Sequence, residues 1–267
     1  VSGKDIKRIH QVPVRFADSE RFVYRKAIEE FEKMRRNYFS STGNLRKDAM
    51  MRLIQQITLL LRISAAPNTV HEYTGGTPAK ILKVLNMRDE IVAIGVRHKI
   101  VVNAYAEAIR ERFPDRPLFV VTGSTTTLVA RRKLRKTLRE SKNGILLCTQ
   151  QSLPSSVNFE FVDNVIIPEL HYNNSRMSQF YMRFIRYNST RQKNIYFVTY
   201  LGSIESNQMQ MVLAKEKLNL FMRGQDTDLD DIYERFGVDY DLLSVLMSRE
   251  MDENGKMYIK WGEQNIA

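Results

Sequence analysis

Two arginines and a glutamine recur at helical spacing shortly before a very apolar segment. Gln179, Arg183 and Arg186 stand at positions i, i+4 and i+7, so a helix here would bring them to one face. Guanidinium groups are permanently charged donors that suit phosphate oxygens. The same spacing is also typical of a solvated helix face, so the chemistry depends on what surrounds these residues.

Other residue patterns that carry chemistry are missing from the sequence. The glycine-rich segment GGTPAK at 75–80 does not fit the phosphate loop G-x-x-x-x-G-K-[ST], and no strand precedes it. Asp89 and Glu90 come before the first apolar strand instead of after one, which disfavours a catalytic carboxylate there. The sequence predicts no metal site, because ligand spacing is absent among the histidines, which we interpret as ordinary surface or loop residues: His10, His71, His98 and His171.

Positive charge is concentrated in the first 225 residues, although the formal net charge is only +11. Residues 226–267 hold 11 acidic and 4 basic side chains, which leaves 37 basic against 19 acidic side chains in residues 1–225. Such a field favours a polyanionic partner, nucleic acid above all, because neutralised phosphates release condensed counterions. An anionic membrane is the weaker rival, since no basic helix carries a bulky, aromatic-rich apolar face.

Length and cysteine usage point to a globular, intracellular protein. The 267 residues are 43% hydrophobic, which is enough for a packed core. No run approaches the roughly 18 consecutive apolar residues of a membrane span, and the N-terminus has no apolar signal core. The single Cys148 excludes an intrachain disulfide, and we expect it to be a buried strand-end residue. Because the chain begins at Val1 and not at methionine, we expect a longer parent protein.

A helical lead-in is predicted for residues 1–87. Apolar side chains recur at helical spacing over 18–39 and again over 45–61, and the breaker SSTGN separates the two segments. We expect these helices to pack as a hairpin. A loop follows, and AKILKVL at 79–85 forms a short helix.

An α/β core is predicted for residues 88–225, where continuous apolar runs of strand length alternate with helical segments. This alternation predicts a parallel sheet with helices on both faces. An acidic C-terminal extension, 226–267, follows and holds one candidate strand. The expected strands of the core are 91–96, 117–123, 144–149, 161–169 and 195–201, and its helices are 99–113, 128–141 and the segment that begins near Gln179.

The segment around the two arginines resembles the C-terminal lobe of superfamily 2 helicases of the Swi/Snf type. In that family a helix carries Q-x-x-x-R-x-x-R, and a strand and a G-[ST]-I-E turn follow it. The matching residues here are Gln179, Arg183 and Arg186, the strand 195–201 and the turn 202–205.

The resemblance extends upstream and covers about residues 10–222. TGST at 122–125 is similar to the family's G-x-T segment, and ILLCT at 145–149 is similar to its strand that ends in Ser or Thr. The resemblance implies a RecA-like parallel sheet, preceded by an α-helical hairpin subdomain.

Specific roles follow from this resemblance. Arg186 would be the arginine finger that reaches the γ-phosphate of ATP, with Arg183 beside it, and Gln179 would couple the nucleotide and nucleic-acid sites. The ATP, with Mg, would be held mainly by an N-terminal RecA-like lobe of the same parent chain. Sequence-independent contacts to the DNA backbone would come from Thr122, Gly123, Ser124, Thr125, Arg131, Arg132 and Thr149.

The implied function is that of an ATP-dependent DNA helicase or translocase, with this lobe inactive by itself. One segment keeps an alternative open: QQSLPSSVNF at 150–159 has no glycine, whereas the family has a glycine-rich stretch there. A non-catalytic nucleic-acid-binding protein that retains the lobe fold would tolerate this change. A protein-interaction scaffold is a third interpretation, and the acidic extension 226–267 could fold back on the basic body as a brake.

Overall fold

The computed structural model describes residues 6–123, 127–153, 158–170, 179–186, 188–207, 250–251, 254 and 257–258. Contacts divide the chain into two compact units, which we name the sheet unit and the helical unit. The sheet unit comprises Val1–Val14 and Gly76–Thr199, and the helical unit comprises Arg15–Gly75 and Tyr200–Ala267. The units therefore differ from the predicted segments, because an N-terminal strand and the first short helix after Gly75 group with the sheet.

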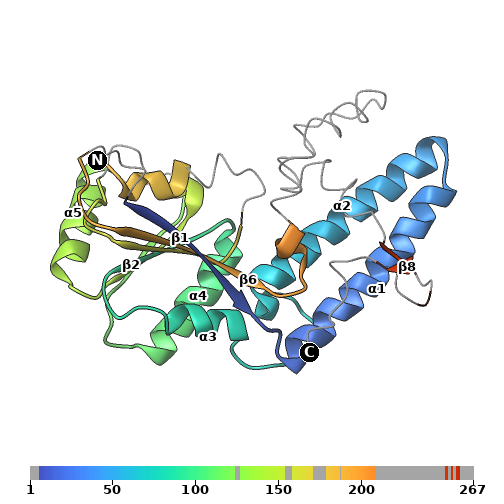
Figure 1. The fold of residues 1–267 in the computed structure, drawn as a ribbon, viewed down its shortest axis with the longest axis horizontal. Helices are drawn as coiled ribbons and strands as arrows, with labels where there is room; N and C mark the ends of the chain where they lie inside the picture. Colours follow the sequence, from blue (N-terminus) through green and yellow to red (C-terminus); the bar gives the residue numbers. More distant parts are fainter. Residues whose placement is uncertain are drawn as a thin grey trace. The chain divides into compact units, whose positions relative to one another are not determined.

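The sheet has six strands in the order β1-β6-β5-β2-β4-β3 (Figure 1). β2 pairs in parallel with β4 and β5, β3 pairs in parallel with β4, and β5 with β6. The parallel α/β sheet expected from the sequence is confirmed. The strand bounds are β1 (Lys7–Val14), β2 (Val92–Val96), β3 (Leu118–Val121), β4 (Ile145–Thr149), β5 (Asn164–Ile167) and β6 (Lys193–Tyr200).

Helices cover both faces of the sheet. On one face, Leu138 of α5 and Phe180 form a buried cluster with Ala93 of β2 and its neighbours. Successive strand residues point to opposite faces, so Ile94 lies on the other face, where α4 contacts β2, β3 and β4. Every residue of β2, β4 and β5 is buried, which explains why these strands are continuous apolar runs. The helix bounds are α3 (Ala79–Leu85), α4 (Lys99–Arg112) and α5 (Leu128–Glu140).

The edge strand β1 was not predicted from the sequence. The Lys193 N–H donates to the Ile6 carbonyl at 2.9 Å, and the His10 ring stacks on Tyr196 at 4.7 Å between centroids. Residue numbers rise together along the two strands, so β1 runs in the same direction as β6. Its sequence KRIHQVPV is half polar and contains Pro13, which a sheet tolerates at an edge. Such a strand lacks the continuous apolar signal of the central ones.

The helical unit is built on the predicted hairpin, formed by α1 (Asp18–Ser40) and α2 (Gly43–Ala65) (Figure 1). Phe31 and Leu53 are fully buried between the helices. The Gln56 amide donates to the Ala27 carbonyl at 2.8 Å, which ties α2 to α1. The hairpin prediction is confirmed.

A buried polar network joins the end of β6 to α1 within the helical unit. The Tyr200 hydroxyl donates to the carboxylate of Glu20, and the Phe16 ring stacks on Tyr200 at 4.1 Å. The Ile204 N–H donates to the Tyr24 hydroxyl at 2.8 Å. Burial raises the pKa of the Tyr24 hydroxyl, so it remains a neutral partner. The turn at 202–205 is therefore anchored on the first helix.

Removing the Tyr200 hydroxyl is expected to destabilise the chain. The variant Tyr200→Phe leaves the buried Glu20 carboxylate with one donor fewer, which costs about 2 kcal/mol in the free energy of unfolding. Urea denaturation measures this change. Tyr38→Phe is the matched control, because Tyr38 is equally buried and its hydroxyl has no hydrogen-bond partner among the described residues. Equal losses in the two variants would contradict the role of the Tyr200 hydroxyl.

The C-terminal extension lies largely outside the described residues. Two short strands, β7 (Glu250–Met251) and β8 (Met257–Tyr258), pair antiparallel, and β8 falls in the segment where one strand was expected. Among the residues that the structure describes, no helix has the length and apolar character needed to cross a membrane.

Candidate functional site

Polar residues gather where the parallel strands end. The carboxyl ends of β3 and β4 are adjacent, so Thr122 and Gly123 lie beside Thr149. Ser152 connects them: its hydroxyl accepts from the Gly123 N–H at 2.8 Å and bonds to the Thr149 hydroxyl. Gly123 has φ +79°, which glycine adopts without strain. The structure thus brings together three of the predicted backbone-contact residues, whereas Ser124 and Thr125 lie outside the described residues.

The segment with the two arginines does not form one continuous helix. Gln179 to Tyr181 are helical, Met182–Phe184 form a 3₁₀ helix (η3), and Ile185 is extended with φ −116° and ψ 124°. The predicted single face at i, i+4 and i+7 is therefore wrong. The reason is packing: Phe180, Phe184 and Ile185 are all buried, and the change to extended backbone at Ile185 ends the helical spacing before Arg186.

Phe180 and Phe184 hold this segment against the sheet. A Cβ at Gly95 of β2 would lie 2.3 Å from the Phe180 ring, so glycine permits this close approach. Phe184 meets Phe180 edge-on at 5.5 Å and Phe159 at 6.1 Å between ring centroids. After the extended Ile185, the Arg186 N–H donates to the Ser189 hydroxyl at 2.8 Å, which begins a turn. The backbone that carries both arginines is thus fixed by core contacts.

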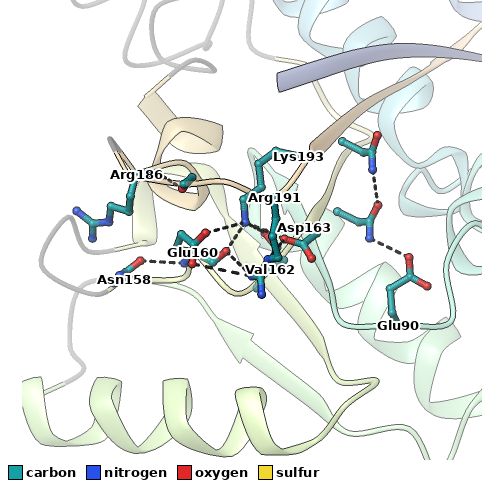
Figure 2. Close-up of polar contacts among 11 residues, drawn as sticks. Glu90, Asn158, Glu160, Val162, Asp163, Arg186, Arg191 and Lys193 are labelled. Carbon is teal, nitrogen blue, oxygen red and sulfur yellow. Dashed lines mark hydrogen bonds and ion pairs between the residues drawn. The ribbon is translucent and has the colours of Figure 1, made fainter. Parts of the chain in front are cut away.

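Both guanidinium groups are half-buried and lack full pairing. The Nε atoms of Arg183 and Arg186 are buried and have no hydrogen-bond partner among the described residues. Burial lowers the pKa of Arg183. Burial raises the pKa of the Cys148 thiol, and the charge of Arg183 lowers it in part, so Arg183 acts electrostatically at the end of β4. Figure 2 shows the Arg186 side chain pointing away from the carboxylates of Glu160 and Asp163. Two incompletely satisfied cations suit an anionic ligand.

No protein-family model matches this sequence, and no curated protein does. Structures of similar fold include the Sulfolobus solfataricus SWI2/SNF2 ATPase core in complex with dsDNA, with a TM-score of 0.61 and 14% identity over 85% of this chain and 49% of that chain. The C-terminal part of the Fun30 ATPase domain gives a TM-score of 0.58 and 16% identity over 88% of this chain and 98% of that chain. The fold is that of the C-terminal lobe of SWI2/SNF2 ATPases.

A third structure agrees with this assignment of fold. The Sulfolobus solfataricus SWI2/SNF2 ATPase C-terminal domain gives a TM-score of 0.57 and 13% identity, over 87% of this chain and 94% of that chain. The chain thus matches nearly all of two C-terminal domains but only 49% of the ATPase core. At such identities the likeness concerns the fold, so the chemistry of this SWI2/SNF2-type lobe depends on its own residues.

A second polar network lies at the ends of β2, β4 and β5 of this lobe. The buried Glu169 carboxylate accepts from the N–H groups of Arg97 at 2.9 Å and His98 at 3.3 Å, and it also contacts the His98 ring. The Gln150 amide donates to the Glu169 carbonyl at 2.8 Å and to the Gly95 carbonyl at 3.3 Å. His98 was interpreted from the sequence as an ordinary surface or loop residue, and it is exposed between β2 and α4. The structure adds that it occupies the N-cap position of α4 and contacts Glu169. Their positions could have predicted this contact, since His98 and Glu169 each lie two residues after the end of a parallel strand.

The basic helix α5 begins shortly after Gly123 in the sequence. The Thr127 side chain caps its N-terminus by accepting a hydrogen bond from the Ala130 N–H at 3.2 Å. Arg132 is exposed and Arg131 is half-buried. Arg135 donates to the Asn158 carbonyl at 2.5 Å, and both Arg135 and Arg139 stand over the Phe161 ring at 5.7 and 6.0 Å. Two of its cations are therefore partly engaged in packing, and the exposed ones are Arg132, Lys133, Lys136 and Arg139.

Arginine donors, and not clustered metal ligands, are found among the described residues. No group of three His, Cys, Asp or Glu side chains capable of holding a metal occurs in the part of the chain that the structure describes. The unpaired Nε atoms of Arg183 and Arg186 are suited to phosphate oxygens.

Proposed function

We propose that this chain is the C-terminal lobe of an ATP-dependent DNA helicase or translocase. Its partner in catalysis would be an N-terminal RecA-like lobe of the same parent chain, which would hold most of ATP and Mg. The observation that carries the proposal is the pair of half-buried arginines with unpartnered Nε atoms, fixed beside the strand ends of a SWI2/SNF2-type lobe.

In this proposal the two arginines act on the γ-phosphate. Arg186 is the arginine finger, which stabilises the charge that grows on the phosphoryl oxygens in the transition state. Arg183 adds positive charge beside it, and the exposed Gln179 couples the nucleotide to the nucleic acid. Closure of the two lobes on ATP brings the finger into place, and reopening after hydrolysis removes it. Repeated closure would move the lobes along one strand, while the lobe alone would remain inactive.

DNA is the proposed polyanion, and its backbone is the part contacted. Thr149 and Gly123 both bond to Ser152 at the strand ends, and Thr122 follows directly after β3. The threonine hydroxyls there can donate to phosphate oxygens. Ser124 and Thr125 belong to the same proposed contact. Arg131 and Arg132 at the start of α5 add attraction that does not depend on sequence. One of the similar structures is an ATPase core in complex with dsDNA, which agrees with DNA as the ligand here.

One observation favours the alternative of a non-catalytic nucleic-acid-binding protein. Gln150–Ser152 form a 3₁₀ helix (η2), and Gln150 is buried and bound to two carbonyls. Such a segment is less free to move with ATP than a glycine-rich loop would be. DNA-stimulated ATP hydrolysis by the longer parent protein separates the two functions. Turnover that Arg186→Ala abolishes with DNA binding retained supports the motor, and a parent protein with no turnover overturns it.

A further inference from the structure

The connection between α1 and α2 carries an unusual concentration of positive charge. Residues 33–47, which we name the hairpin tip, contain five basic and no acidic side chains. The acidic residues of α1 all precede the tip, so the charge separates along the hairpin. Arg36 and Lys47 each lie about one helical turn from the connection, and both are exposed. The basic residues are Lys33, Arg35, Arg36, Arg46 and Lys47.

Aromatic and apolar side chains are exposed among these cations. Phe39 is 54% exposed and Leu45 is 71% exposed, although both belong to helices whose other large apolar residues mostly face the core. The Arg35 guanidinium stands over the Phe39 ring at 4.9 Å, and that of Arg46 stands over the buried Tyr38 ring at 4.7 Å. An arginine held over an exposed ring presents a flat, cationic surface.

Few acidic groups compete with an anion for Lys33 and Arg36. Lys33 approaches the Glu30 carboxylate only at 3.9 Å, and Arg36 makes no ion pair with any residue that the structure describes. Asp48, just after the tip, is the nearest following acid in the sequence. At and beside the connection, small polar residues are exposed, which gives hydroxyl and amide donors but no broad apolar face: Ser40 at the end of α1, Thr42, and Asn44 at the start of α2.

We propose that the hairpin tip is a nucleic-acid-binding surface, separate from the strand-end site and located in the other unit of the chain. Arg36 and Lys47 contact phosphates, and Phe39 stacks on an unpaired base. Positive charge interleaved with an exposed aromatic ring is the chemistry that binds single strands without regard to sequence. A membrane would need a wider apolar face than Phe39 and Leu45 provide. An acidic peptide would use the charges but would not require the ring.

The test measures binding of the chain to a fluorescent oligothymidylate by anisotropy over a range of salt concentrations, without ATP. The double variant Arg36→Glu/Lys47→Glu is expected to weaken binding about tenfold or more, and to lower the slope of log K against log salt by about 1.4, which corresponds to two phosphates on a single strand. The matched control is Arg25→Glu/Arg52→Glu, which makes the same change of charge at exposed positions of α1 and α2 outside the tip. It is expected to remain within about twofold of the wild type.

A second pair of variants tests the stacking. Phe39→Ala is expected to weaken oligothymidylate binding about tenfold with an unchanged salt slope, because one stacked base is lost and no phosphate contact is. Phe22→Ala is the control, since Phe22 is 65% exposed on α1 outside the tip. Thermal melts establish that each variant folds.

Three outcomes would overturn the proposal. The tip and control charge variants could weaken binding equally, both could leave it unchanged, or the tip variant could lose binding only to vesicles of anionic lipid. Because the measurement contains no ATP, it is independent of Arg186. A parent protein without ATP turnover would refute the motor and leave the hairpin-tip surface standing. Oligothymidylate binding that the tip variants do not weaken would refute the hairpin-tip surface and leave the motor standing.

Discussion

Replacing Arg186 by alanine is expected to lower DNA-stimulated ATP hydrolysis by the longer parent protein about a thousandfold, while DNA affinity is retained. A thousandfold loss corresponds to about 4 kcal/mol of transition-state stabilisation. The physical reason is that the Arg186 guanidinium, whose Nε is buried and unpartnered, has no competing carboxylate among the described residues to give up before it meets phosphate. Steady-state hydrolysis with saturating DNA, together with separate anisotropy measurements of DNA binding, checks this result.

Two further variants sharpen the interpretation. Arg191→Ala removes an arginine five residues away that is 51% exposed and paired with Asp163 at 3.1 Å, so it is expected to leave turnover nearly unchanged. Arg186→Lys keeps the charge but removes the planar fork, so it is expected to restore only part of the rate. The loss should appear in kcat more than in KM, because a finger acts in the transition state. Full activity in Arg186→Ala would make the residue a solvated surface arginine.

The central strands could be predicted from the sequence because burial on both faces leaves a continuous apolar run. β2, β4 and β5 are buried at every residue, and no charged position interrupts the pattern. The edge strand β1 lacks this constraint on one side, so its alternating polar residues gave no comparable signal. The hairpin of α1 and α2 was also predictable, because helical spacing persists over more than five turns in each segment.

The candidate site was predictable in its residue types but not in its geometry. Spacing put Arg183 and Arg186 on one helix, whereas the demand to bury Phe180, Phe184 and Ile185 ends that helix before Arg186. The partners of the site are far apart in sequence: Ser152 lies 29 residues from Gly123, and Glu169 lies 71 residues from His98. Local sequence patterns do not predict such long-range pairings, because the register of the parallel strands determines which residues meet.

Lys193 is another residue whose partners are far away in the sequence. It lies where the parallel strands begin, at the amino ends of β5 and β6. Its side chain is fully buried, and the Nζ donates to the Val162 carbonyl at 3.0 Å and to Asp163 Oδ1 at 2.9 Å (Figure 2). It also donates to the Glu160 carbonyl. A lysine at the start of an apolar strand gave no signal in the sequence, yet here it holds the chain that leads into β5 against the start of β6.

Replacing Lys193 by methionine is expected to destabilise the chain by about 3 kcal/mol. Methionine keeps the volume and the apolar stem of the side chain but removes every donor, so two carbonyls lose a partner and Asp163 loses its closest cation. The Asp163 side chain is 36% exposed, so water can solvate the carboxylate in part. The expected loss of stability is therefore at the lower end of the range for breaking a buried ion pair. The midpoint of urea denaturation measures the change, provided that the slope is unaltered.

Arg191→Ala is the matched control for this loss as well, because Arg191 pairs with the same Asp163 carboxylate from an exposed position. A surface pair contributes under about 1 kcal/mol, since water screens the charges and competes for the donors. If the two variants lost equal stability, the burial of Lys193 would not matter, and the contribution would come from the contacts that both residues make with the Asp163 carboxylate and the Glu160 carbonyl. If only Lys193→Met lost stability, the hydrogen bond to the Val162 carbonyl and the burial of the ammonium group would account for the difference, because Arg191 also donates to the Glu160 carbonyl and pairs with the same carboxylate.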